Sequence, residues 1–121
     1  VLAPRLMPGM TPDQIQTLSA LGYFYLLQGF PDRALTIYKG LNQLAPGEVS
    51  TLKGLALSHA QQKQPMQAMA VLDQLALKGA TDATYHLVRS QALMSLQRAD
   101  EAQAAMRAYL SARGNDTRAA A

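Results

Sequence analysis

The sequence predicts an all-α chain built from three tandem helical hairpins. One observation is an internal repeat, clearest in the equal spacing of Ala34, Ala68 and Ala102. A second is composition, because 49% hydrophobic and 16% charged residues suit a chain with a packed core rather than a disordered one. A single helical hairpin cannot bury its apolar face alone, so neighbouring copies are expected to stack.

Local signals define the ends of six helices. Thr11 and Gln14 form a predicted capping box at the start of the first helix. Gly29 can adopt the left-handed conformation that ends this helix, and Pro31 and Pro65 suit the first turn of the helices that follow. The predicted helices span residues 12–28, 31–44, 48–62, 65–78, 82–96 and 99–112.

A period of about 34 residues with a helix–turn–helix unit is the signature of the tetratricopeptide repeat, which implies a short right-handed superhelix. The first copy matches best: Gly22 and Ala34 are small enough for two helices to approach closely, and Tyr25 and Tyr38 fill the layer between them. Gly40 inside the second helix costs about 1 kcal/mol relative to alanine, and a close helix crossing would explain it. The predicted units are an N-terminal extension 1–14, repeats 15–48, 49–82 and 83–116, and a tail 117–121.

No pattern in the chain points to catalysis. His59 and His86 are isolated from each other and occupy repeat positions that normally pack, so a metal site is not expected. Glycine-rich phosphate loops, nucleophile elbows and HExxH motifs do not occur. The sequence therefore predicts a protein that is not an enzyme, with no catalytic residues, metal or cofactor.

Charge and hydropathy narrow the range of partners. The net charge is only +3 and the basic residues are scattered, so nucleic acid is not expected as a partner. The longest apolar run, 18–27, is too short to span a membrane, and the start of the chain does not resemble a signal peptide. The absence of cysteine excludes disulfides and fits a reducing compartment.

Stacked repeats of this kind bind partners on a concave surface lined by the first helix of each hairpin. The inward positions form an apolar groove suited to an apolar peptide or an amphipathic helix. A carboxylate clamp is a weaker interpretation, because only Lys53 is available for it. In a tightly wound superhelix, some of the apolar groove positions would instead be core residues, namely Tyr23, Leu26, Leu57, Leu87 and Met94. The predicted groove residues are Tyr23, Leu26, Leu27, Lys53, Leu57, Leu87, Gln91 and Met94, with Gln16, Ser19, Ser50, Ala60, Thr84 and Val88 beside them.

The stretch LGYFYLLQGFPDRALTIYKGLNQLAP, residues 21–46, resembles the tetratricopeptide chaperones of bacterial type III secretion systems. The resemblance extends from Thr11 to Arg113. Chain length favours the SctY/YscY-type chaperones, which pair with a small exported protein of the SctX/YscX type. Class II chaperones of pore-forming translocators have a similar motif and are the next candidate family.

This resemblance implies a bacterial cytoplasmic escort that uses no ATP. Its partner would be a secreted protein, held as an extended or helical segment, with a possible homodimer when that partner is absent. Two other hypotheses stay open: a general interaction scaffold within a larger assembly, and a regulatory subunit of an enzyme.

Overall fold

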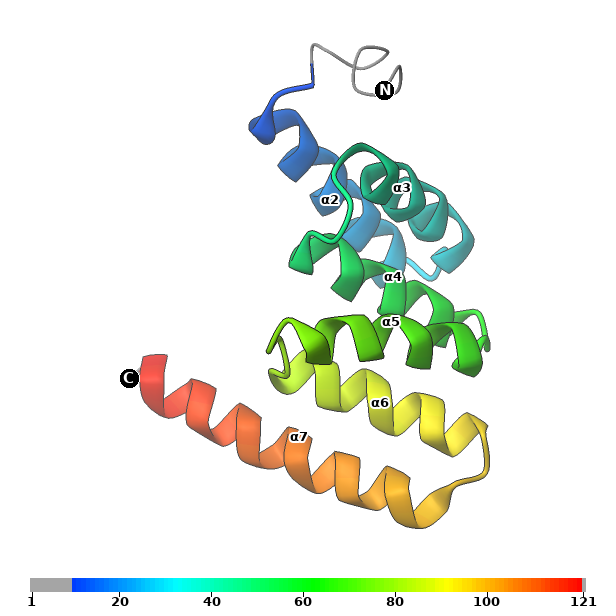
Figure 1. Cartoon of the computed structure of the whole chain (residues 1–121), viewed down its shortest axis with the longest axis vertical. Helices are drawn as coiled ribbons and strands as arrows, with labels where there is room; N and C mark the ends of the chain where they lie inside the picture. Colours follow the sequence, from blue (N-terminus) through cyan, green and yellow to red (C-terminus); the bar gives the residue numbers. More distant parts are fainter. Residues whose placement is uncertain (1–9, 121) are drawn as a thin grey trace.

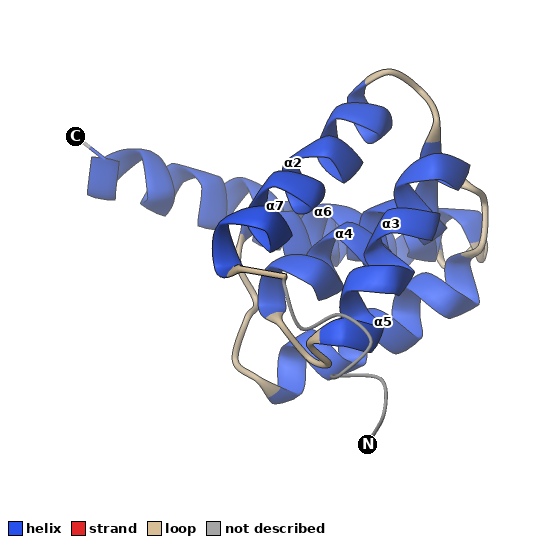
Figure 2. Cartoon of the chain, turned by 90° about the horizontal axis from the view of Figure 1, so that it is seen from above, coloured by secondary structure: helices blue, strands red, loops and turns tan. Residues whose placement is uncertain are grey.

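The computed structural model describes residues 10–120, with side chains for residues 10–115, and all regular structure in this range is helical (Figures 1 and 2). The helices lie close to their predicted positions. They are α2 (Pro12–Leu27), α3 (Pro31–Leu44), α4 (Val49–Gln61), α5 (Pro65–Leu77), α6 (Ala83–Ser95) and α7 (Ala99–Ala120).

Consecutive helices pair into three hairpins, α2 with α3, α4 with α5, and α6 with α7. The hairpins stack in chain order, because α3 packs on α4 and α5 packs on α6 (Figure 1). The first helices of the hairpins also meet one another, α2 with α4 and α4 with α6. The predicted fold of tandem helical hairpins is therefore confirmed.

The predicted start of α2 is confirmed in detail. The Thr11 hydroxyl accepts a hydrogen bond from the Gln14 backbone N–H at 3.1 Å, and the Gln14 side chain accepts one from the Thr11 N–H at 2.9 Å. This reciprocal pair is a capping box, which satisfies two backbone donors that a helix start leaves free. Proline stands in the first turn of α2, α3 and α5.

The first helix of every hairpin ends in the same way, at equivalent positions of the repeat. Gly29, Lys63 and Gln97 have positive φ values of 83°, 61° and 60°. A left-handed residue at this point lets the next backbone N–H reach back and bond a carbonyl inside the helix. These bonds are Phe30 to Tyr25 at 2.8 Å, Gln64 to His59 at 2.9 Å and Arg98 to Leu93 at 2.9 Å.

His59 takes part in one of these helix ends. In the first hairpin the side chains at the two bonded positions are Tyr25 and Phe30, whose rings meet edge to face with centroids 6.4 Å apart. In the second hairpin His59 Nδ1 and Gln64 Oε1 lie 2.7 Å apart at the same positions. His59 is half-buried, so it has the packing role that the sequence indicates.

The last helix is longer than predicted. The sequence pattern predicts an end near residue 112, but α7 spans 22 residues to Ala120, whereas α6 has 13 residues. Its final turns project past α6 in both views (Figures 1 and 2). The prediction was wrong because the segment contains no proline, and Gly114 alone costs only about 1 kcal/mol in a helix of alanine and polar residues. Most of the predicted extension 1–14 lies outside the described residues, as does Ala121 at the end of the tail.

The core divides into a large and a small part. The large cluster joins the first two hairpins, with Leu52, Leu72 and Leu75 almost fully buried, and reaches α6 through Val88. The small cluster lies in the third hairpin and consists of Leu93, Ala102 and Ala105, with Met69 of α5 packed against it.

Candidate functional site

Two clefts open along the first helices of the hairpins. The first, called cleft 1, has a volume of about 690 Å³ and lies between α2, α4 and the first turn of α6. Its lining is mostly apolar and includes hydroxyl and amide groups. The lining residues are Pro12, Ile15, Gln16, Ser19, Ala20, Tyr23, Tyr38, Ala45, Glu48, Ser50, Thr51, Lys53, Gly54, Leu57 and Thr84.

Tyr38 of α3 forms the floor of cleft 1. Its ring is only 3% exposed and lies between two glycines, Gly22 of α2 and Gly54 of α4. Its hydroxyl donates a 2.8 Å hydrogen bond to the Ser19 carbonyl in α2. One side chain therefore holds three helices together beneath the cleft.

Burial raises the pKa of the Tyr38 phenol. The unfolded chain should ionise this group near pH 10, while the folded chain keeps it protonated to a higher pH. The contribution of Tyr38 to the free energy of unfolding should therefore be fully present below about pH 10 and be lost as the pH rises through the folded-state pKa.

We expect Tyr38→Phe to remove this alkaline dependence. The variant should be about 1 kcal/mol less stable at pH 8, since it lacks the bond to Ser19, but its stability should fall less between pH 9 and 11. Urea midpoints measured across this range for both proteins check the prediction. Equal slopes in the two proteins would contradict it.

An ion pair joins α4 to the start of α6 at one side of cleft 1. The Lys53 ammonium donates to Oδ2 of Asp82, while the other Asp82 oxygen caps α6 by accepting from the Tyr85 N–H at 3.2 Å. Burial acts to raise the pKa of the Asp82 carboxyl, but the Lys53 and Tyr85 hydrogen bonds outweigh it and hold the pKa below its usual range. The Lys53 charge is thus already compensated, which argues against a carboxylate clamp.

The second cleft, called cleft 2, has a volume of about 580 Å³ and lies further along the same helices. It is bounded by the end of α4, the second half of α6 and the start of α7. The lining residues are Ala60, Gln61, Lys63, Ser90, Gln91, Met94, Ser95, Ala102, Gln103 and Met106.

Five of the eight predicted groove residues line these clefts. Tyr23, Lys53 and Leu57 belong to cleft 1, and Gln91 and Met94 belong to cleft 2. Residues at positions separated by three or four lie on one side of a helix, which is why the repeat register places these side chains on the inner surface. Of the residues named beside them, Gln16, Ser19, Ser50 and Thr84 line cleft 1, and Ala60 lines cleft 2.

The other three predicted groove residues lie elsewhere. Leu26 is only 5% exposed and belongs to the large core, because it shares the side of α2 that carries Gly22. Leu27 ends α2 and is 66% exposed, outside both linings. Leu87 is half-buried and lines neither cleft, and the neighbouring Val88 is buried in the core. The assignment of Leu26 and Val88 to the groove was therefore wrong.

Several cleft residues were not predicted from the sequence. Gly54 and Tyr38 meet only when the first two hairpins are in place. Gln103 and Met106 come from α7, a second helix of a hairpin, which the repeat pattern assigns to the outer layer. Their spacing of three residues was the signal that they share one side of α7.

We compared the sequence with the sequence profiles of known protein families. The sequence profile of the family described as Tetratricopeptide repeat matches residues 25–92, which is more than half of the chain. The chain belongs to the tetratricopeptide repeat family. No curated protein matches the chain.

The tetratricopeptide repeat is a protein-interaction unit rather than a catalytic one, so this chain is suited to binding other proteins. Among the side chains that the structure describes, residues 10–115, no group of three or more His, Cys, Asp or Glu residues could hold a metal ion. Across the same part of the chain, no helix is both long and apolar enough to cross a bilayer.

Proposed function

We propose that this tetratricopeptide protein is a chaperone of a bacterial type III secretion system. It binds an apolar segment of a small exported partner of the SctX/YscX type along clefts 1 and 2. The observation that carries the proposal is a row of apolar side chains, Tyr23, Leu57 and Met94, that line the clefts and stay at least partly open to solvent.

The physical role follows from the apolar lining. A secretion substrate exposes apolar segments that aggregate before export, and the clefts bury such a segment without any covalent step. The protein acts in the bacterial cytoplasm, where the substrate is located before export. A translocator of the class II type would use the same clefts. Without its partner, the chain pairs with a second copy through the apolar surface.

A general interaction scaffold is a second candidate, and one observation favours it. The outer side of α2 exposes Leu21 and Phe24, and Leu27 and Phe30 extend the apolar surface at its end. In a longer repeat array, a preceding hairpin packs on this side of the helix. A parent chain with additional repeats would support this alternative.

The chaperone proposal predicts that one exported protein of the same secretion system co-purifies with this chain. Co-expression with each exported protein in turn identifies that partner. The complex should melt roughly 5 °C or more above the free chain, because a ligand that binds only the folded state stabilises it. Thermal unfolding of the purified complex measures this shift.

The groove is tested with two variants that place a charge in cleft 1. Leu57→Asp should abolish co-purification, and Tyr23→Asp should do the same at a site that is exposed in the free chain. The matched control is Leu77→Asp, because Leu77 lies on α5 outside both clefts and is 89% exposed. If Tyr23→Asp and Leu57→Asp fold normally and retain the partner, the groove is not the binding site.

A further inference from the structure

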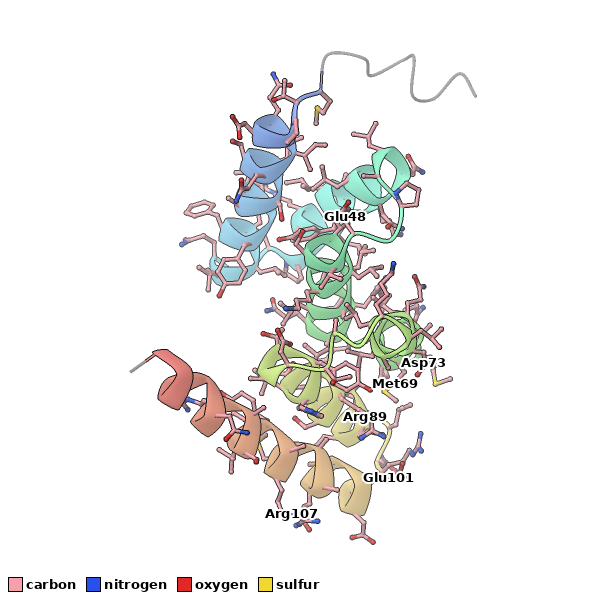
Figure 3. The ribbon with its side chains drawn as sticks, turned by 60° about the vertical axis from the view of Figure 1, so that its left-hand side comes forward. Glu48, Met69, Asp73, Arg89, Glu101 and Arg107 are labelled. Atoms are coloured by element: carbon pink, nitrogen blue, oxygen red, sulfur yellow. The ribbon has the colours of Figure 1, made fainter. Side chains whose placement is uncertain are left out.

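The two clefts carry opposite charges at the two ends of α4. Glu48 lines cleft 1 and immediately precedes the first turn of α4 (Figure 3). Lys63 lines cleft 2 and follows the end of the same helix. Both residues are exposed. Within the described residues, neither side chain has a hydrogen bond or ion pair.

The remaining charges in the two linings do not cancel this difference. Lys53 also lines cleft 1, but Asp82 compensates it. Lys63 is the charged residue of the cleft 2 lining. Cleft 1 is therefore acidic and cleft 2 basic, and the inner surface has an electrostatic polarity along α4.

The two clefts lie on one continuous side of α4. Leu57 of cleft 1 and Ala60 and Gln61 of cleft 2 are separated by three and four residues, so they share one helix face. Glu48 and Lys63 flank the 13 residues of α4, so roughly 20 Å along the helix axis separates them. An extended peptide covers this distance with about seven residues.

The uncharged polar groups favour an extended ligand over a helical one. Gln16 and Ser50 in cleft 1, and Gln61 and Gln91 in cleft 2, offer amide and hydroxyl groups beside the apolar lining. An extended peptide has backbone N–H and C=O groups that need such partners, whereas a helix satisfies its own.

We infer that the occupant of the two clefts is an extended peptide segment with a basic residue in cleft 1, an acidic residue in cleft 2 and an apolar stretch of about seven residues between them. This inference rests on the proposed function and adds the composition and the orientation of the bound segment. Complementary charges at the two ends fix the direction in which the segment lies, more than they raise its affinity.

The test is a selection from a displayed library of random 12-residue peptides. The full chain and the double variant Glu48→Lys/Lys63→Glu are used as parallel targets, and the double variant Tyr23→Asp/Leu57→Asp provides the background. Circular dichroism first establishes that all three proteins are equally helical. Peptides enriched on the full chain should carry a basic and an acidic residue at opposite ends of an apolar stretch.

The charge-reversed variant should enrich peptides with the opposite order of charges. A peptide selected on the full chain should bind that variant about three- to ten-fold more weakly in low salt, and the difference should vanish in about 1 M salt. Exchanging the two charges in the peptide should restore its affinity for the variant. Fluorescence polarisation with labelled peptides measures each value.

Two failures are distinguishable. If peptides are enriched above the background but show no charge order, or the same order on both targets, the inference is wrong and the groove remains a binding site. If no peptide is enriched above the background, the inference and the proposed groove fail together.

Discussion

Gly54→Ala should destabilise the protein by about 3 kcal/mol, although alanine is the better helix former. A Cβ at Gly54 would lie 2.3 Å from Cε1 and Cζ of the Tyr38 ring. The ring cannot retreat, because it is buried and a Cβ at Gly22 on α2 would already lie within 2.8 Å of it. Chemical unfolding followed by circular dichroism measures the loss.

The matched control is Gly40→Ala on α3. No atom lies within 4 Å of a Cβ placed at Gly40, so a close helix crossing does not explain this glycine. Alanine there should stabilise the protein by about 1 kcal/mol, through helix propensity alone. The two substitutions are chemically identical and should have opposite signs.

A double variant separates ring contact from other causes. Leucine at position 38 removes the ring atoms that the new methyl group meets, so Gly54→Ala should cost much less in a Tyr38→Leu background. If the two changes are additive, or if Gly54→Ala is neutral in the native background, the three-helix contact does not limit the packing.

The positions of the helices follow from signals within a few residues of each end. The sequence alone predicts these ends, because each signal involves only nearby backbone groups. The signals are the capping box of Thr11 and Gln14, the prolines in the first turns, and the left-handed Gly29. Lys63 and Gln97 adopt the same left-handed conformation as Gly29 without being glycine. Neither residue type marks a helix end by itself, so only their equivalence to Gly29 in the internal repeat indicates the conformation of Lys63 and Gln97.

The spacing of residues along each helix predicts only part of the inner surface. Spacing predicts which way a side chain points from its helix, and this placed Tyr23, Lys53 and Met94 at the clefts. It does not predict how far a neighbouring helix covers that direction, so Leu26 proved to be core. The ion pair between Lys53 and Asp82 joins residues from different hairpins, which local spacing cannot reveal.

The length of α7 could not be predicted from the repeat pattern. The third copy of the repeat is faint, and its outer helix continues beyond the repeat period because nothing stops it. The exposed positions of α7 include Arg107, which points away from the other helices (Figure 3), and Leu110, which is 57% exposed.

Leu93→Ala should unfold the third hairpin before the other two. Leu93 is 0% exposed and is the only large side chain buried in the small core cluster of the described residues, where Ala102 and Ala105 accompany it and the partly buried Met69 packs against them. A buried leucine replaced by alanine costs about 2–5 kcal/mol, and the two alanines of the cluster are too small to fill the space that it leaves. The first two hairpins keep their own core. Because repeats interact mainly with their neighbours, local loss need not spread.

Hydrogen exchange measures the protection of the backbone amides in each helix separately and so tests this prediction. Amides of α7 should lose protection in Leu93→Ala while amides of α4 and α5 keep theirs, and urea unfolding should separate into two transitions. Met94→Ala is the matched control, since Met94 is the next residue on α6 and is 60% exposed, so truncating it removes little buried surface. A single transition, with protection lost equally in all helices, would mean that the small cluster is not an independent unit and that the three hairpins fold as one.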